Sequence, residues 1–269
     1  MTNPLAADAT LRIEEGNGMR DLLNMEGKTV LVTGGSRGIG EMIARGFVEN
    51  GARVYISSRK ADACATLAEE LSASGECVAL PADLSTSQGV DHLAAALAER
   101  EQKLDVLVNN AGASWGAPLD EFPEDGWDKT MNLNLKGVFF LTQRLLPLLR
   151  AAASPAQSAR VINISSINGL RPPTIETYAY SASKAGLIML TRHLAQRLIE
   201  ENILVNAIAP GLFVTKMTTA LVDHFLQETK MNRPGRPEEI AGVALFLASP
   251  AAGYTTGAVI PCDGGVAEF

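Results

Sequence analysis

The sequence of 269 residues is poor in the residues that build metal sites, disulfide frameworks and nucleic-acid surfaces. It contains three cysteines and three histidines, with no CxxC pair and no ligand-like spacing between the histidines. Asp and Glu (30) outnumber Lys and Arg (23), which gives a formal net charge of −7, and no basic block occurs. These absences argue against a metal site and against nucleic acid or an anionic membrane as a partner. The few cysteines are consistent with a reducing cytoplasm.

The chain also lacks a long hydrophobic run. The best apolar stretch, around Val243–Ala248, is far shorter than the ~18 residues of a membrane span. Residues 1–27 are acidic and lack the basic and apolar regions of a secretory signal, so we expect a cytoplasmic protein. The composition is nevertheless 46% hydrophobic, which excludes intrinsic disorder. We expect a flexible arm over residues 1–24 and one folded domain over residues 25–269.

Short β-branched runs alternate with helical stretches along this domain. The expected strands are Lys28–Thr33, Ala52–Ser57, Glu76–Pro81, Leu104–Asn109, Arg160–Ser165, Ile203–Ala209 and Gly257–Pro261. The expected helices are Gly38–Asn50, Ala61–Ser74, Thr86–Arg100 (after Ser85 as N-cap), Trp127–Arg150, Tyr180–Glu201 and Pro237–Ala248. The alternation predicts an α/β fold of the Rossmann type, a doubly wound parallel sheet of seven strands with helices on both faces. Residues 212–232 follow a strand end and are expected to form a partly helical substrate lid.

The first expected strand runs into a glycine-rich turn, Thr33 to Gly40 (TGGSRGIG), that opens a helix. Glycines in such a turn let the backbone approach a pyrophosphate, and the free N–H groups of the helix start favour an anion. The end of the second strand reads Ser58-Arg59-Lys60 and lacks the acid that grips an NAD ribose. Arg37, inside the glycine turn, can face the same place. We therefore predict NADPH, with the alternative that Arg59 and Lys60 are solvated surface charges.

A tyrosine and a lysine are placed for proton transfer. Tyr180 and Lys184 stand at i and i+4 and share one face of the expected helix. An ammonium beside a phenol favours the phenolate, so we expect Lys184 to lower the pKa of Tyr180 from ~10 toward the working pH. Tyr180 then donates a proton to a carbonyl oxygen that receives a hydride.

These motifs have a familiar combination and order. The TGxxxGxG turn, the sequence Asn109-Asn110-Ala111-Gly112, the Tyr-x-x-x-Lys pair and Asp263-Gly264-Gly265 resemble those of the short-chain dehydrogenase/reductase family, in its single-domain NAD(P)-dependent branch. The resemblance covers residues 25–269 and is nearest to bacterial 3-oxoacyl reductases, particularly those associated with rhamnolipid synthesis. It implies NADPH-dependent reduction of a 3-oxoacyl thioester, on acyl carrier protein or coenzyme A, or of a related ketone.

The resemblance also assigns roles to residues. Ser166 hydrogen-bonds the substrate carbonyl, with Ser165 as the alternative, and Asn134 holds a water in the proton relay to Lys184, with Asn132 as its less favoured twin. Asp83 addresses the adenine or caps the following helix, or does both. Lys184 also binds the nicotinamide ribose, and Thr215 lies near the carboxamide and pyrophosphate. The cofactor-binding residues expected in this way are Gly34, Ser36, Arg37, Gly38, Ile39, Gly40, Ser58, Arg59, Asp83, Leu84, Asn110, Ala111, Gly112, Tyr180, Lys184, Pro210, Gly211, Phe213 and Thr215.

The substrate is less constrained. The expected wall residues are Ser114, Trp115, Ser166, Ile167, Asn168, Tyr178, Phe213 and Met217. Trp115 either offers an apolar surface or anchors its loop, and Arg171 meets either an anionic acyl carrier or solvent. The acidic segment Ile199–Asn202 disfavours an acidic carrier protein, because reductases that use one tend to be basic there.

Other functions stay open. A secondary-alcohol, steroid or sugar-acid dehydrogenase would use the same machinery, and a catalytically silent NADPH-binding regulator is the alternative outside enzymes. The family resemblance further implies a homotetramer built through Trp127–Arg150, Tyr180–Glu201 and the C-terminal strand.

Overall fold

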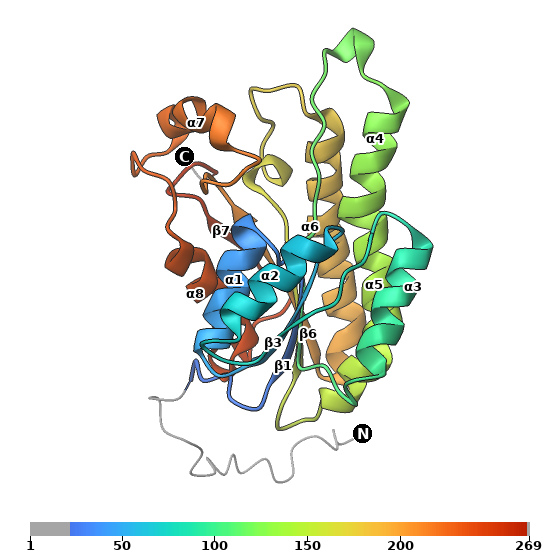
Figure 1. Ribbon diagram of the computed structural model, residues 1–269. Coiled ribbons are helices and arrows are strands. Elements are labelled where there is room, and N and C mark those ends of the chain that lie inside the picture. Colours follow the sequence, from blue (N-terminus) through green and yellow to red (C-terminus); the bar gives the residue numbers. More distant parts are fainter. Residues whose placement is uncertain (1–21, 268–269) are drawn as a thin grey trace, which may run out of the picture.

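Seven parallel strands form a single sheet in the order β3-β2-β1-β4-β5-β6-β7 (Figure 1). This computed structural model describes residues 22–267, so most of the arm predicted for residues 1–24 lies outside the described residues. The strands are β1 (Thr29–Thr33), β2 (Arg53–Ser57), β3 (Cys77–Ala79), β4 (Val106–Asn109), β5 (Ala159–Ile164), β6 (Ile203–Pro210) and β7 (Val259–Cys262). The predicted α/β fold with a seven-stranded parallel sheet is confirmed.

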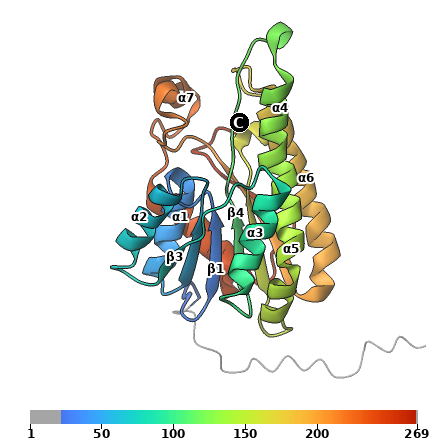
Figure 2. The ribbon, with the colours of Figure 1, turned by 45° about the vertical axis from the view of Figure 1, so that its right-hand side comes forward.

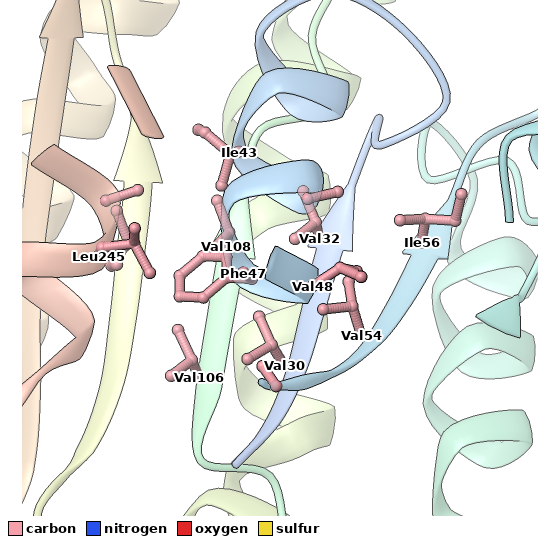
Figure 3. Close-up of a cluster of buried hydrophobic side chains, with 14 of the residues drawn as sticks. Val30, Val32, Ile43, Phe47, Val48, Val54, Ile56, Val106, Val108 and Leu245 are labelled. Atoms are coloured by element: carbon pink, nitrogen blue, oxygen red, sulfur yellow. The ribbon is translucent and has the colours of Figure 1, made fainter. Parts of the chain in front are cut away.

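Helices cover both faces of the sheet (Figures 1 and 2). One face carries α1 (Gly38–Glu49), α2 (Ala61–Leu71) and α8 (Pro237–Ala248), and the other carries α3 (Ser87–Ala98), α5 (Gly137–Ala152) and α6 (Tyr178–Leu198). The side chains of β1 alternate between the two layers: Val30 and Val32 face the first core, and Leu31 faces the second. In Figure 3, Phe47 of α1 lies among the valines of β1 and β4.

Several helix boundaries differ from the sequence prediction; α2, for example, ends at Leu71 and not at Ser74. The helix α3 is capped by Thr86, whose hydroxyl accepts a hydrogen bond from the Gly89 amide at 3.0 Å, and not by Ser85. The helix α6 begins two residues earlier than expected, at Tyr178. The single helix predicted over Trp127–Arg150 is α4 (Glu124–Met131) followed by one π-helical turn, Asn132–Lys136, and then by α5.

The strand order reverses between β1 and β4, because the chain leaves β1 toward β2 on one side and returns to β4 on the other. Parallel sheets bind ligands in the crevice at such a reversal, beyond the carboxyl ends of the strands. The glycine turn after β1 and the Asn110–Gly112 turn after β4 meet at this point. Within the described residues no helix is long and apolar enough to cross a membrane.

Candidate active site

A cavity of about 1100 Å³ lies at the carboxyl ends of the strands. Its wall is built by the segments that follow the seven strands, and the segment after the edge strand β7 contributes Val266. Beyond β6, the lid predicted for residues 212–232 covers it. That segment is partly helical, as expected, and contains a 3₁₀ turn, Thr219–Leu221, and α7 (Val222–Glu228).

The glycine turn forms one end of the cavity and leaves no room for side chains. A Cβ atom on Gly34 would lie 2.9 Å from the Ala111 Cα, and one on Gly40 would lie 2.3 Å from the Gly34 carbonyl oxygen. Gly34 (φ +63°) and Gly38 (φ +59°) also adopt backbone angles that favour glycine. The Asn110 amide ties the two turns together, donating to the Thr33 carbonyl at 2.9 Å. The result is a cradle of bare backbone at the start of α1, which fits a pyrophosphate.

Basic side chains stand beside this cradle. Arg37, Arg59 and Lys60 all line the cavity, are exposed, and form no ion pair with any other residue of the segment 22–267. Unpaired guanidinium groups are suited to a bidentate contact with a phosphate. The residues present therefore fit NADPH at this end of the cavity better than NADH.

The loop after β3 has a different geometry from the one expected. Leu84 lines the cavity, whereas Asp83 does not. The Asp83 Oδ1 accepts hydrogen bonds from the Ser85 amide (3.0 Å) and from the Ser85 hydroxyl (2.7 Å), so the carboxylate shapes the turn that precedes α3. The cap role considered for Asp83 is therefore not observed, because the following helix is capped by Thr86.

Tyr180 and Lys184 lie at the centre of the cavity wall. Lys184 is 3% exposed, and its Nζ lies 5.6 Å from the centroid of the Tyr180 ring and donates to the Ile164 carbonyl at 2.7 Å. Burial lowers the pKa of Lys184 to about 8. Burial also raises the pKa of Tyr180, and its hydrogen bond with Ser166 offsets this only in part.

The expectation that Lys184 lowers the pKa of Tyr180 is therefore wrong for this structure. The desolvation of the phenol outweighs the influence of its neighbours, and the ammonium is directed to a backbone carbonyl. A phenol with a raised pKa stays protonated at neutral pH, which suits a proton donor.

The two candidate serines have different partners. The Ser165 hydroxyl is buried and donates to the Lys184 carbonyl at 3.0 Å, so it joins β5 to α6. Ser166 lines the cavity next to Tyr180, and its hydroxyl accepts from the Asn168 amide at 3.1 Å. The Ser166 hydroxyl faces Tyr180 in the cavity, whereas the Ser165 hydroxyl is used between β5 and α6, which favours Ser166 over Ser165.

Asn134 lies in the π-helical turn, and both polar atoms of its side chain have partners. Its Oδ1 accepts from the Ala113 amide (2.8 Å), and its Nδ2 donates to the Ala113 carbonyl (2.9 Å) and to the Ser183 hydroxyl (3.0 Å). The side chain therefore fixes the loop after β4 against α6. The second lone pair of Oδ1 is the one side-chain site left for a water, so a water held by Asn134 stays a prediction.

Six of the eight residues expected in the substrate wall line the cavity. Ser114, Ser166, Ile167, Asn168, Phe213 and Met217 line the cavity, as do the expected cofactor residues other than Asp83. Trp115 does not: its ring packs on Gly126 of α4, with the Lys129 Nζ 4.9 Å from the ring centroid. Trp115 is thus the anchor of its loop, the second of the two roles considered for it.

Tyr178 was expected in the wall and is absent from it. Its hydroxyl donates to Glu176 at 2.9 Å, and its ring makes an edge contact with Phe122. Residue 178 and Tyr180 are two positions apart on a helix and point about 200° apart, so only one of them can face the cavity.

Several lining residues had no signal in the sequence. Examples are Ser57, Ala63, Ala82, Lys129, Ile175, Glu176, Thr177 and Val266. Thr177 stands three residues before Tyr180 and could have been found by helical spacing. The lid residues Phe225 and Glu228 belong to no motif, and their position depends on how the lid folds back.

Comparison with known proteins agrees with this geometry. Residues 34–267 match the family model described as "Enoyl-(Acyl carrier protein) reductase". The rhamnolipids biosynthesis 3-oxoacyl-[acyl-carrier-protein] reductase of Pseudomonas aeruginosa is 51% identical over 253 residues, which cover 92% of this chain and 99% of that protein. The 5-keto-D-gluconate 5-reductase of Escherichia coli is 35% identical over 256 residues, which cover 92% of this chain and 98% of that protein.

A solved structure extends the likeness to the fold. The Pseudomonas aeruginosa RhlG/NADP active-site complex superimposes with a TM-score of 0.90 at 50% identity, over 93% of this chain and 100% of the other. The match with the family model spans most of the chain, and the relatives are covered almost completely. The chain therefore belongs to the short-chain dehydrogenase/reductase family.

Proposed function

We propose that this protein is an NADPH-dependent carbonyl reductase whose substrate is a 3-oxoacyl thioester or a related ketone. One observation carries the proposal: Tyr180, Lys184 and Ser166 lie together in a cavity that also contains the glycine cradle and its unpaired arginines. The 3-oxoacyl-[acyl-carrier-protein] reductase relative, 51% identical, supports the substrate class, and the similar structure in complex with NADP supports the cofactor.

NADPH would supply the hydride. The residues that would hold it are the glycine cradle for the pyrophosphate, Arg37 and Arg59 for the 2′-phosphate, and Thr215, whose methyl group would lie 3.2 Å from a Cβ on Gly38. Asn110, Ala111, Gly112, Pro210 and Gly211 form the wall between these ends. Lys184 would bind the ribose hydroxyls.

The reacting carbonyl is handled by side chains of β5 and α6. The Ser166 hydroxyl donates a hydrogen bond to the carbonyl oxygen, and the Tyr180 phenol donates the proton that completes the alcohol. As the proton leaves, Tyr180 becomes a phenolate, and the positive charge of Lys184 stabilises it. In the opposite direction Tyr180 accepts the proton from the alcohol.

Two chemistries of thioester carrier are compatible with this surface. The acidic segment at residues 199–202 was expected to disfavour an acidic carrier protein. Glu201, however, accepts from Arg150 at 2.6 Å and from Arg197 at 2.7 Å, so its charge is balanced locally. This weakens the argument against a carrier protein, and we propose both carrier-bound and coenzyme A thioesters as substrates.

A sugar-acid reductase is the second candidate. The observation that favours it is the 35% identity to a 5-keto-D-gluconate 5-reductase over nearly the full length of both chains. Its active groups would be the same, and only the wall around the substrate would differ.

A substrate panel tests the proposal. Oxidation of NADPH is followed with acetoacetyl-CoA, with 5-keto-D-gluconate and with a simple ketone. We expect acetoacetyl-CoA to give the highest kcat/KM; a higher value for the sugar acid would favour the second candidate. Binding of NADPH without turnover of any carbonyl would instead indicate a silent regulator.

Exchange of Tyr180 for Phe tests the proton donor. Tyr180→Phe should lower kcat at least ~100-fold while NADPH binding persists, because the general acid is lost and the ring is kept. Tyr178→Phe removes the same hydroxyl outside the cavity and should leave kcat unchanged. Equal activity of Tyr180→Phe and the native protein would contradict the assignment.

We further propose a cytoplasmic homotetramer, with residues 25–269 acting as one domain. Apolar side chains on α4, α5 and α6 support the assembly: Trp127, Phe139 and Met189 are 41%, 37% and 61% exposed. Between these helices runs a shallow groove that includes Met131, Leu135 and Leu190. The edge strand β7 offers a second surface, because one of its sides has no strand beside it.

A further inference from the structure

The cavity has two rims that face each other. One is the segment 167–177 between β5 and α6, called here the β5–α6 rim, which contributes Asn168 and Ile175 to the lining. The other is the lid, residues 212–232, which contributes Met217 and Phe225. Figure 1 shows α7 of the lid beside the yellow loop that precedes α6.

A cluster of polar side chains joins the rims. Glu228, at the last turn of α7, binds Arg171 of the β5–α6 rim through its Oε2 at 2.5 Å, and its Oε1 accepts from the Thr174 hydroxyl at 3.2 Å. His224, one turn earlier on α7, shares a hydrogen bond with the same Thr174 hydroxyl at 2.8 Å. We call Arg171, Thr174, His224 and Glu228 the Glu228 cluster.

The ends of the lid are fixed in other ways. Phe213 bridges to Gly235 next to β6, and the Met231 amide donates to the Gly264 carbonyl at 3.2 Å. Between these points, the side-chain hydrogen bonds from the lid to the β5–α6 rim in residues 22–267 are those of the Glu228 cluster. The middle of the lid therefore depends on this cluster for its position over the cavity.

The rim side of the cluster is stiff. Arg171 is followed by Pro172 and Pro173, whose rings fix the backbone and lower the entropy lost when the arginine is held. The Arg171 and Glu228 side chains are 37% and 24% exposed, so the pair is partly shielded from water. Glu228 itself lines the cavity, which places the cluster at the edge of the substrate space.

We propose that Glu228 is a positioning residue that holds the lid closed over Tyr180 and Ser166 through Arg171 and Thr174. The inference rests on the proposed function only for its choice of substrate. The cluster closes the cavity around a bound carbonyl compound and has to open for release. Arg171, which was expected to meet an acyl carrier or solvent, is engaged within the chain.

The proposal predicts a specific split between kinetic constants. Weakening a lid that retains the substrate raises KM, and kcat stays constant or rises, because opening speeds release and the reacting groups are untouched. Loss of a partly shielded ion pair with a supporting hydroxyl corresponds to a rise in KM of roughly 3- to 10-fold. A variant that merely damaged the fold would lower kcat instead.

The test uses a charge-swap cycle on the full chain. Arg171→Glu and Glu228→Arg are each expected to raise KM for acetoacetyl-CoA roughly 3- to 10-fold without lowering kcat. The double variant restores the opposite charges and should recover much of the loss. Single variants that leave KM unchanged would overturn the proposal. So would a double variant whose KM is raised as much as the two single effects combined.

A matched control and a second readout keep the result independent of the substrate. Asp91→Arg breaks the Arg144–Asp91 pair between α3 and α5, which has a similar N–O distance of 2.8 Å and lies outside the cavity lining, and should change neither constant. Hydrogen exchange of the α7 amides should be faster in each single variant than in the native protein, and slower again in the double variant Arg171→Glu with Glu228→Arg. This exchange result stands even if acetoacetyl-CoA is not a substrate, and unchanged exchange would refute the cluster's role.

Discussion

Lys184 is surrounded by protein on all sides except the cavity, and its titration reflects this. The folded chain lowers its pKa to about 8, whereas the unfolded chain keeps the ordinary value of 10.5. Between these two values the unfolded state binds more protons than the folded state. The free energy of unfolding that this group contributes therefore rises as the pH rises from about 8 to 10.5, and the burial penalty is at its full size below that window.

This gives a prediction for Lys184→Met, which removes the titrating group and keeps an unbranched side chain. From pH 7.5 to pH 9.5 the native protein should gain roughly 1–2 kcal/mol of stability relative to the variant. Urea unfolding of both proteins at the two pH values measures the difference. If the difference in free energy of unfolding stayed constant with pH, or if the variant gained stability relative to the native protein as the pH rose, burial would not lower the pKa of Lys184.

Arg37 and Arg59 determine the cofactor preference if the unpaired guanidinium groups hold the 2′-phosphate. Exchange of both for Ser should reduce the preference for NADPH over NADH roughly 10- to 100-fold, because charged hydrogen bonds are lost. Arg37 is the N-cap of α1, where Ser is favourable, so the helix should persist. Arg45→Ser on the same helix removes a cation that is paired with Glu41 and Glu70, and it should leave the preference unchanged. Persistence of the preference in the double variant would place phosphate recognition elsewhere.

At this scale the sequence could predict which residue types take part but not always where they point. Helix spacing placed Tyr180 and Lys184 on one face, the family resemblance pointed to Ser166, and all three line the cavity. Trp115 and Tyr178 were misplaced in the substrate wall. Trp115 turns to a site on α4 that exists only because residue 126 is a glycine, and no local pattern reveals that contact.

Among the elements, the π-helical turn Asn132–Lys136 is the one that the sequence could not show. A π-helical turn adds one residue to a helix and hardly changes the spacing of its apolar residues. The sequence therefore predicts one continuous helix over Trp127–Arg150. Asn134 lies within this turn and is buried, and its side-chain amide holds Ala113 and Ser183. The regular strands and helices were predictable because burial on both faces imposes continuous apolar runs on each strand.

The close packing of the glycine cradle can be tested by exchanging Gly40 for Ala, with the exchange of Gly242 in α8 as the control. Gly40→Ala places a methyl group 2.3 Å from both the Gly34 carbonyl oxygen and the Asn110 amide nitrogen, so it should destabilise the fold and weaken NADPH binding at least ~10-fold. Gly242→Ala in α8 meets nothing within 4 Å and should stabilise the protein by roughly 0.5–1 kcal/mol. Thermal unfolding and NADPH titration measure both. Tight NADPH binding by Gly40→Ala would contradict the close approach of the backbone to the cofactor.

At the scale of the whole molecule, one face exposes apolar side chains although the net charge is negative. The net charge of −7 disfavours non-specific association. The face formed by α4, α5 and α6 nevertheless exposes Trp127, Phe139 and Met189, and α4 packs against α6 there. Scattered apolar side chains need no explanation, but several on neighbouring helices around one groove indicate a partner surface. We expect this partner to be a second copy of the chain.

The proposed tetramer would use two such surfaces together. A face that pairs with itself gives a dimer, and a second self-pairing surface at the β7 edge joins two dimers into a tetramer. Light scattering of the native protein should give four times the 28.5 kDa of one chain. Phe139→Glu with Met189→Glu places charges in the helical face and should reduce the mass to two chains, because the β7 contact is untouched. Leu119→Glu, a 66% exposed residue before α4 and outside the groove, should leave four chains. A tetramer that survives the double exchange would show that the helical face is not the interface.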